Sequence, residues 1–219
     1  MFLGHYGVAL AAKRLAPRSS LGTSTLAAQW VDLLWPVLLL AGVEHVRVVP
    51  GLLAASPMDF SDYPWTHSLM MAVIWAGLFG GVTWLATRQR ASALVAAALV
   101  LSHWGLDWLF HRPDLPLWPG GPKAGLGLWA SVPVTALAEA GLFGGGLWLY
   151  LGTTRAKDRI GSIGLAVFAG LLALLYAGVL FGPPPPDASM VAWSALALWL
   201  FVPLAWWVDQ HRERMDAGA

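Results

Sequence analysis

Histidines and acids spaced to share helix faces lie inside otherwise apolar stretches of this sequence. His103 and Asp107 are four residues apart, so on one helix they share a face and can bind one ion together. His67 begins an earlier apolar stretch, and Asp32 and Glu139 lie midway along two others. Because the chain has no cysteine, thiolate ligands, disulfides and a Cys nucleophile are excluded, and imidazole and carboxylate chemistry remains.

Ionisable side chains are costly inside a membrane. A charge at the bilayer centre costs about 2.5–3.5 kcal/mol on insertion scales, so such a residue is by default a functional-site hypothesis. No Lys or Arg lies beside the three acids, and a bound cation would stabilise them. Imidazole and carboxylate together suit Zn, Mn or Fe. We therefore predict a divalent metal, Zn first, as one or two ions, with these ligands: His5, Asp32, His67, His103 and Asp107.

The chemistry that such a site predicts is hydrolysis. A metal with an open position lowers the pKa of bound water toward ~7, and that water can attack an ester or phosphoester. Glu139 or Asp32 is the expected general base. Ser68 follows His67 directly and is a candidate hydrogen-bonding group or nucleophile. Three residues are expected only at the rim of the site: Asp62, His111 and Asp114.

Other interpretations of the same residues stay open. His103 and Asp107 can form a structural hydrogen bond between turns, and Glu139 can be protonated and bonded to another helix. A transporter or an ion- or proton-conducting protein would use the same cluster as a relay, and a non-catalytic membrane scaffold would use it to hold helices together. The cluster lies only in the first four spans and the sequence has no internal repeat, which favours a fixed site over transport.

The elements that must position these residues are membrane helices. The 219-residue sequence is 58% hydrophobic and 11% charged, against roughly 45–50% and about 25% for soluble domains, which excludes a soluble globule. Apolar runs of about 20 residues are long enough to cross a bilayer. We predict an all-α polytopic bundle, a single membrane domain over 1–219, with spans at 24–42, 66–87, 91–110, 128–151, 160–181 and 188–208.

The first 18 residues are expected to form a half-helix. Residues 2–16 are apolar but too short to span, and Lys13, Arg14 and Pro17 end them. This segment suits a helix packed against the bundle, with its chain end pointing into the membrane. Residues 24–151 then carry the site, and 160–208 are expected to be scaffold.

The distribution of Lys and Arg supports six crossings. Cytoplasmic loops are enriched in these residues. Ten of the thirteen would lie on one side: Lys13, Arg14, Arg18, Arg88, Arg90, Arg155, Lys157, Arg159, Arg212 and Arg214. Only Arg47, Arg112 and Lys123 lie on the other, so both termini are predicted to be cytoplasmic. The sequence has no basic stripe of the kind that would predict a nucleic-acid partner. The expected partners are bilayer lipid and a lipid-like substrate.

Depth along the helices brings the candidate ligands together. With a rise of ~1.5 Å per residue, His103 and Asp107 lie roughly 20 and 25 Å from Arg90, and Glu139 lies about 24 Å from Arg155. Asp32 and His5 are expected at about 15 to 20 Å. The sequence therefore predicts one site in the outer half of the membrane.

The motifs at these positions resemble a known family. Gly4-His5, Asp32, Thr66-His67-Ser68-Leu69, and Ser102-His103 through Asp107 resemble, in order, motifs of the YdjM-like family of inner-membrane metal-dependent hydrolases. The resemblance covers about the first 120 residues. It implies a metal-dependent hydrolase in a bacterial inner membrane, and no particular substrate.

The chain departs from that family pattern in two places. The family has two acids in its Pro-Asp-Ile-Asp segment, where this chain has only Asp32, and Asp62-Tyr63-Pro64 replaces the usual His-Arg-Gly. Because these departures remove possible ligands, the number of ions, one or two, stays open.

Overall fold

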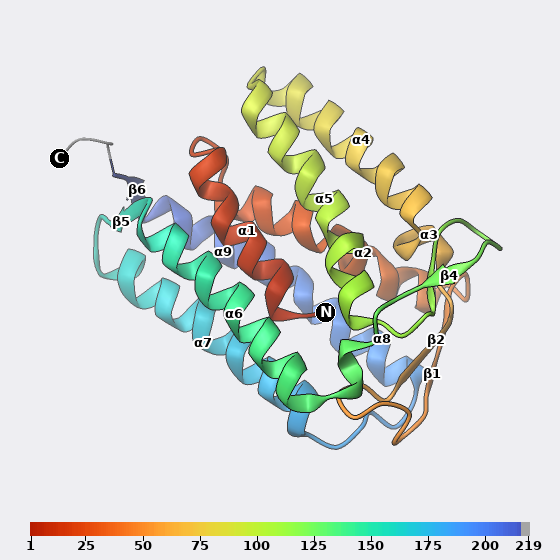
Figure 1. Ribbon diagram of the computed structural model, residues 1–219. Helices are drawn as coiled ribbons and strands as arrows, with labels where there is room; N and C mark the ends of the chain where they lie inside the picture. Colours follow the sequence, from red (N-terminus) through yellow and green to blue (C-terminus); the bar gives the residue numbers. More distant parts are fainter. Residues whose placement is uncertain (216–219) are drawn as a thin grey trace.

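The computed structural model describes residues 1–215 and confirms a helical bundle (Figure 1). Its helices, in chain order, are α1 (Leu3–Leu15), α2 (Leu21–Leu40), α3 (Pro64–His67), α4 (Leu69–Thr87), α5 (Arg90–Phe110), the 3-10 turn η1 (Leu128–Ala130), α6 (Val132–Leu151), α7 (Arg159–Phe181), α8 (Ala188–Leu196), the 3-10 turn η2 (Ala197–Leu200) and α9 (Phe201–Gln210). Within 1–215, six helical segments are long and apolar enough to cross a membrane: α2, α4, α5, α6, α7 and the run Ala188–Gln210.

Short antiparallel strand pairs join the helices at the two ends of the bundle. They are β1 (His45–Val48) with β2 (Met58–Asp62), β3 (Leu115–Pro116) with β4 (Lys123–Ala124), and β5 (Thr154–Ala156) with β6 (Arg212–Arg214). These pairs were not expected from the sequence. They are too short to change the fold class.

The boundaries of the spans differ from the predicted ones where a polar side chain caps a helix. The first span was predicted to begin at residue 24, but Ser20 accepts a hydrogen bond from the Thr23 amide and α2 begins at Leu21. The second was predicted as continuous over 66–87. Instead, Ser68 is extended and caps α4 by accepting from the Met71 amide, so His67 ends the separate helix α3.

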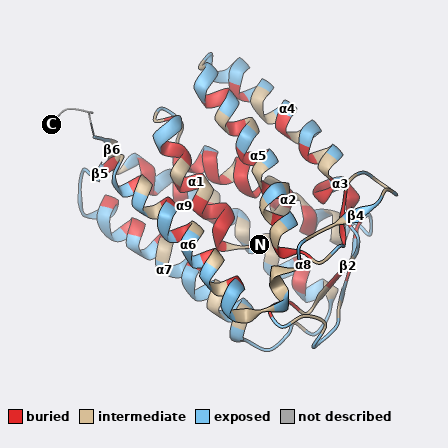
Figure 2. Cartoon of the chain, in the orientation of Figure 1, coloured by how far each residue is buried: buried red, intermediate tan, exposed pale blue. Residues whose placement is uncertain are grey.

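Helix α1 is the predicted half-helix and it is buried. It packs against α6, α2 and α5, and its residues are buried along most of its length (Figure 2). Close approach to α6 depends on glycine, because a Cβ at Gly146 would overlap the carbonyl of Gly7. The start of α1 therefore lies in the middle of the bundle, where Figure 1 marks the N-terminus.

A buried ion pair fixes the other end of α1. Lys13 Nζ lies 2.7 Å from Asp209 Oδ2 of α9, which also accepts from the Leu21 amide at 3.1 Å. The Tyr150 hydroxyl donates to Asp209 Oδ1 at 2.6 Å. One carboxylate thus connects α1, α2, α6 and α9 at the end of the bundle that carries β5 and β6.

The outer helices present apolar side chains outward. Those exposed on α4 and α7 include Val73, Leu78, Val82, Leu85, Ile163, Leu174 and Val179. Exposed apolar rows on long helices are what lipid contact requires. The bundle therefore has an exterior suited to lipid contact and a largely apolar core that encloses a cluster of polar side chains.

Candidate metal centre

The predicted metal ligands come together from four helices. His5 lies on α1, Asp32 on α2, His67 ends α3, and His103 and Asp107 share one face of α5. Two overlapping triads have their ligand atoms within 4.8 Å of one another: His5, His103 and Asp107; and Asp32, His67 and His103. The five predicted ligands therefore lie close together, whereas their depth in the membrane stays a prediction.

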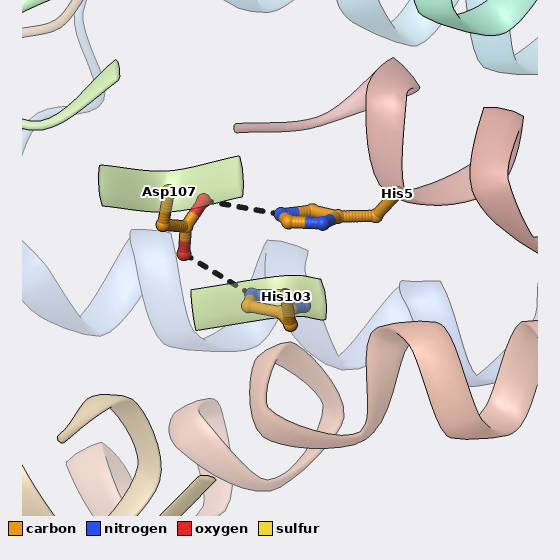
Figure 3. A group of neighbouring side chains, drawn as sticks. All are labelled: His5, His103 and Asp107. Atoms are coloured by element: carbon orange, nitrogen blue, oxygen red, sulfur yellow. Dashed lines mark hydrogen bonds and ion pairs between the residues drawn. The ribbon is translucent and has the colours of Figure 1, made fainter. Parts of the chain in front are cut away.

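Each carboxylate oxygen of Asp107 faces the edge of a different imidazole, as Figure 3 shows. Its Oδ1 is 3.1 Å from His5 Nε2, and its Oδ2 is 3.2 Å from His103 Nε2. The two rings stack face to face with centroids 3.6 Å apart. All three side chains are almost fully buried.

Asp32 completes the second triad. Its Oδ1 is 3.3 Å from His67 Nε2 and 3.6 Å from His103 Nε2. The Asp32 side chain is 21% exposed, while that of His67 is 4% exposed. Access to the centre is therefore on the Asp32 side.

A backbone carbonyl orients His103. Its Nδ1 lies 2.7 Å from the carbonyl oxygen of Ala28, so Nδ1 carries the proton and donates it there. Nε2 then holds the lone pair; it is buried and has no hydrogen-bond partner within residues 1–215. An unpartnered nitrogen aimed at two carboxylates fits a metal ligand.

The Glu44 carboxylate orients His67 through the hydroxyl of Thr66. His67 Nδ1 is 2.7 Å from Thr66 Oγ1, which donates to Glu44 Oε2 at 2.7 Å. Glu44 also accepts from the Trp65 and Thr66 amides, and it is 1% exposed. The chain Glu44 to Thr66 to His67 leaves His67 Nε2 free to face Asp32.

Sequence reasoning missed Glu44. It lies in the connection after the first span, where an acid needs no explanation. No spacing pattern connects it to Thr66, because the β1 and β2 hairpin lies between them. The weak signal available was an acid close to the end of an apolar span.

The electrostatics of the cluster favour a cation. Two carboxylates, Asp32 and Asp107, face three imidazoles in the interior of the bundle. The amino group of Met1 lies 2.6 Å from Asp107 Oδ1 and supplies one positive charge. With neutral imidazoles the cluster keeps a net negative charge, which favours a bound cation, so the donor set fits the predicted metal.

Glu139 lies next to this cluster but belongs to neither triad. Its Oε1 accepts from the Phe2 amide at 2.8 Å, and its Oε2 accepts from the Gly4 amide at 2.9 Å. These are free N–H groups at the start of α1, where a negative charge is favourable. In this structure Glu139 caps α1 from α6, and its role as a base stays a prediction.

Ser68 and the predicted rim residues have other contacts. Ser68 is buried as the cap of α4. Asp62 is largely exposed, with Oδ2 3.5 Å from His45 Nδ1. His111 Nδ1 lies 2.9 Å from Asp114 Oδ1, and both are buried. Burial lowers the pKa of His111, although the Asp114 hydrogen bond acts in the opposite direction.

Comparisons with known proteins leave the site to be interpreted from its own geometry. No family model, no curated protein and no solved structure matches the chain.

Proposed function

We propose that this protein is a membrane-embedded metal-dependent hydrolase that acts on an ester or phosphoester of a lipid or lipid-linked substrate. The observation that carries the proposal is the triad of Asp32, His67 and His103. Two histidines and one carboxylate are a common ligand set in catalytic metal sites that keep an open position. Both histidines have the Nδ1 partner that such ligands need.

The shared histidine limits how many ions can be fully coordinated. A neutral imidazole offers one lone pair, so His103 Nε2 serves one triad at a time. We favour the triad with Asp32, because His5 has no partner for its Nδ1 within the described chain and Asp32 has solvent or substrate access. A single tightly bound ion per chain is therefore expected.

Each residue then has a defined part in hydrolysis. When bound, the ion would act as a Lewis acid and lower the pKa of water toward ~7. Asp107 is the nearest carboxylate outside the favoured triad, with Oδ2 3.8 Å from His67 Nε2. It is our candidate to accept a proton from the attacking water, with His5 hydrogen-bonded to its other oxygen.

The position of the site supports a lipid-like substrate. The triad is buried within a bundle of membrane-spanning helices, and its partly exposed member lies on α2, itself a candidate span. The proposal agrees with the resemblance of the motifs to YdjM-like hydrolases. A bacterial inner membrane is the location we propose with it.

Metal analysis of the purified protein tests the proposal. We expect about one equivalent of a divalent transition metal in the wild type, and less than a tenth of that in His103→Ala and His67→Ala, because each loses a ligand of the favoured triad. His5→Ala should keep most of its metal. His45→Ala is the control, since His45 is 60% exposed and outside the cluster.

Two results would contradict the proposal. Wild type without metal after growth and purification in zinc-supplemented medium would remove the hydrolase interpretation. Metal-loaded protein that moves cations across liposomes, yet releases no product from a panel of lipid esters and phosphoesters, would favour the transport alternative.

A further inference from the structure

Buried polar atoms without partners gather on the two helices that carry His5 and Asp32. Within residues 1–215, α2 contains Thr25 and Gln29, both 1% exposed. The Thr25 hydroxyl and both ends of the Gln29 amide have no hydrogen-bond partner among these described residues. Neither residue belongs to the triads described above.

These side chains line one face of α2 together with Asp32. Thr25, Gln29 and Asp32 follow each other at spacings of four and three residues, which places them within roughly 60° around the helix axis. Along the axis, Gln29 lies about 4.5 Å and Thr25 about 10.5 Å from Asp32, toward the start of α2. They form a polar column on α2 that runs from Thr25 to the centre at Asp32.

The free-energy cost of burying these groups without hydrogen bonds indicates that a bound molecule pairs with them. An amide or hydroxyl removed from water without a compensating hydrogen bond costs about 1–3 kcal/mol in proteins, and more where lipid surrounds the bundle. An apolar side chain at Gln29 would avoid this cost. The Gln29 amide needs a molecule that can both donate and accept a hydrogen bond, and water does both.

We propose that Thr25 and Gln29 hold water inside the bundle and form a hydrated column that supplies water to the centre at Asp32. The spacing of these side chains along α2 suits bound water. Two successive hydrogen bonds of about 2.8 Å span roughly 5.5 Å, close to the axial steps of about 6 and 4.5 Å along the column. The rise along the helix axis is therefore compatible with one water between each pair of side chains. The supply role rests on the proposed hydrolysis, whereas the presence of water does not.

Water contact at Gln29 can be measured directly. The chain contains three glutamines, Gln29, Gln89 and Gln210, so selective ¹⁵N-glutamine labelling gives three side-chain amide signals. In bilayer-reconstituted protein, solid-state NMR should show magnetisation transfer from water to the Gln29 amide despite its burial. Gln210 is exposed and is the positive control. Absence of transfer at Gln29 would overturn the proposal.

Assignment does not depend on a fragile variant. Gln89→Leu and Gln210→Leu remove the signals of the other two glutamines, and Gln29 is then identified by elimination even if Gln29→Leu does not fold. If a non-hydrolysable lipid phosphonate abolishes the water transfer, the column binds the polar part of the substrate, and the supply role is wrong.

A second measurement separates this proposal from the hydrolase itself. Gln29→Leu should keep its metal and lose about tenfold in turnover, which corresponds to the loss of one hydrogen-bonding partner, whereas Gln210→Leu should keep both. If wild type is metal-free but still shows water transfer at Gln29, the hydrated column is supported and the hydrolase proposal is contradicted. Unchanged turnover in Gln29→Leu would remove the supply role.

Discussion

At the scale of single residues, the orientation of His67 depends on a side chain that is not itself a ligand. The Thr66 hydroxyl accepts from His67 and donates to Glu44. Such outer partners fix the tautomer of a ligand, and their removal commonly costs 10–100-fold in metal affinity. Glu44 is thus the anchor of this arrangement.

Replacing the Thr66 hydroxyl tests this arrangement. In Thr66→Val the shape is kept but the link from Glu44 to His67 is lost, so we expect metal affinity to fall by about 10-fold or more in competition with a chelator. Thr135→Val is the matched control, because Thr135 is also buried but donates to the Leu128 carbonyl outside the centre. Equal affinities in the two variants would contradict the role given to Thr66.

The five clustered residues could be predicted because the regular periodicity and rise of a helix relate sequence spacing to position in space. His103 and Asp107 share a face by their four-residue separation, and the rise per residue placed Asp32 at a similar depth. Glu139 was correctly expected near the cluster, but the sequence could not show that the start of α1 would occupy both of its oxygens. That contact joins residues about 135 positions apart.

At the scale of elements, α1 can carry His5 to the centre only because it packs closely on α6. Gly7 and Gly146 form that contact, and a Cβ at Gly146 has no room. Gly145, the residue just before it on α6, is exposed and has open space around its Cβ position. The two neighbouring glycines therefore make a matched pair.

Alanine at these two positions should have opposite effects on stability. Gly→Ala inside a helix ordinarily stabilises by about 1 kcal/mol, as expected for Gly145→Ala. Gly146→Ala should instead destabilise by about 1–3 kcal/mol through overpacking. Thermal unfolding in detergent measures both. Two variants with the same increase in melting temperature would show that α1 and α6 are not tightly packed.

The elements were largely predictable, and the differences arise from local capping. All six spans lie where the apolar runs indicated, since length and hydropathy decide what can cross a bilayer. The break at Ser68 was not predicted, although Pro64 and Ser68 are both typical of helix starts. The contact of Thr66 with Glu44 is not visible in the sequence, so nothing there indicated that residues 66 and 67 are separate from the apolar run that follows.

At the scale of the whole molecule, the two ends of the bundle differ in charge and structure. One end carries β5, β6 and most of the Lys and Arg residues, and the other carries β1 to β4. The excess of basic residues predicts that the first end is cytoplasmic. The centre then lies nearer the exterior face.

This orientation can be tested because the natural chain has no cysteine. Ser61→Cys and Arg159→Cys each introduce one thiol at an exposed position, at opposite ends of the bundle. In intact cells a membrane-impermeant maleimide should label the first and not the second, and both after permeabilisation. The reverse pattern would invert the assigned orientation.

The capping of α1 by Glu139 also has a consequence for how the protein is made. His5 is synthesised first among the clustered residues, but its helix is held by a carboxylate of α6, more than 130 residues later. This contact can therefore form only after α6 has been synthesised. Asp32, His67, His103 and Asp107 all precede Glu139 in the chain, so the favoured triad is synthesised in full before the residue that holds His5 in place.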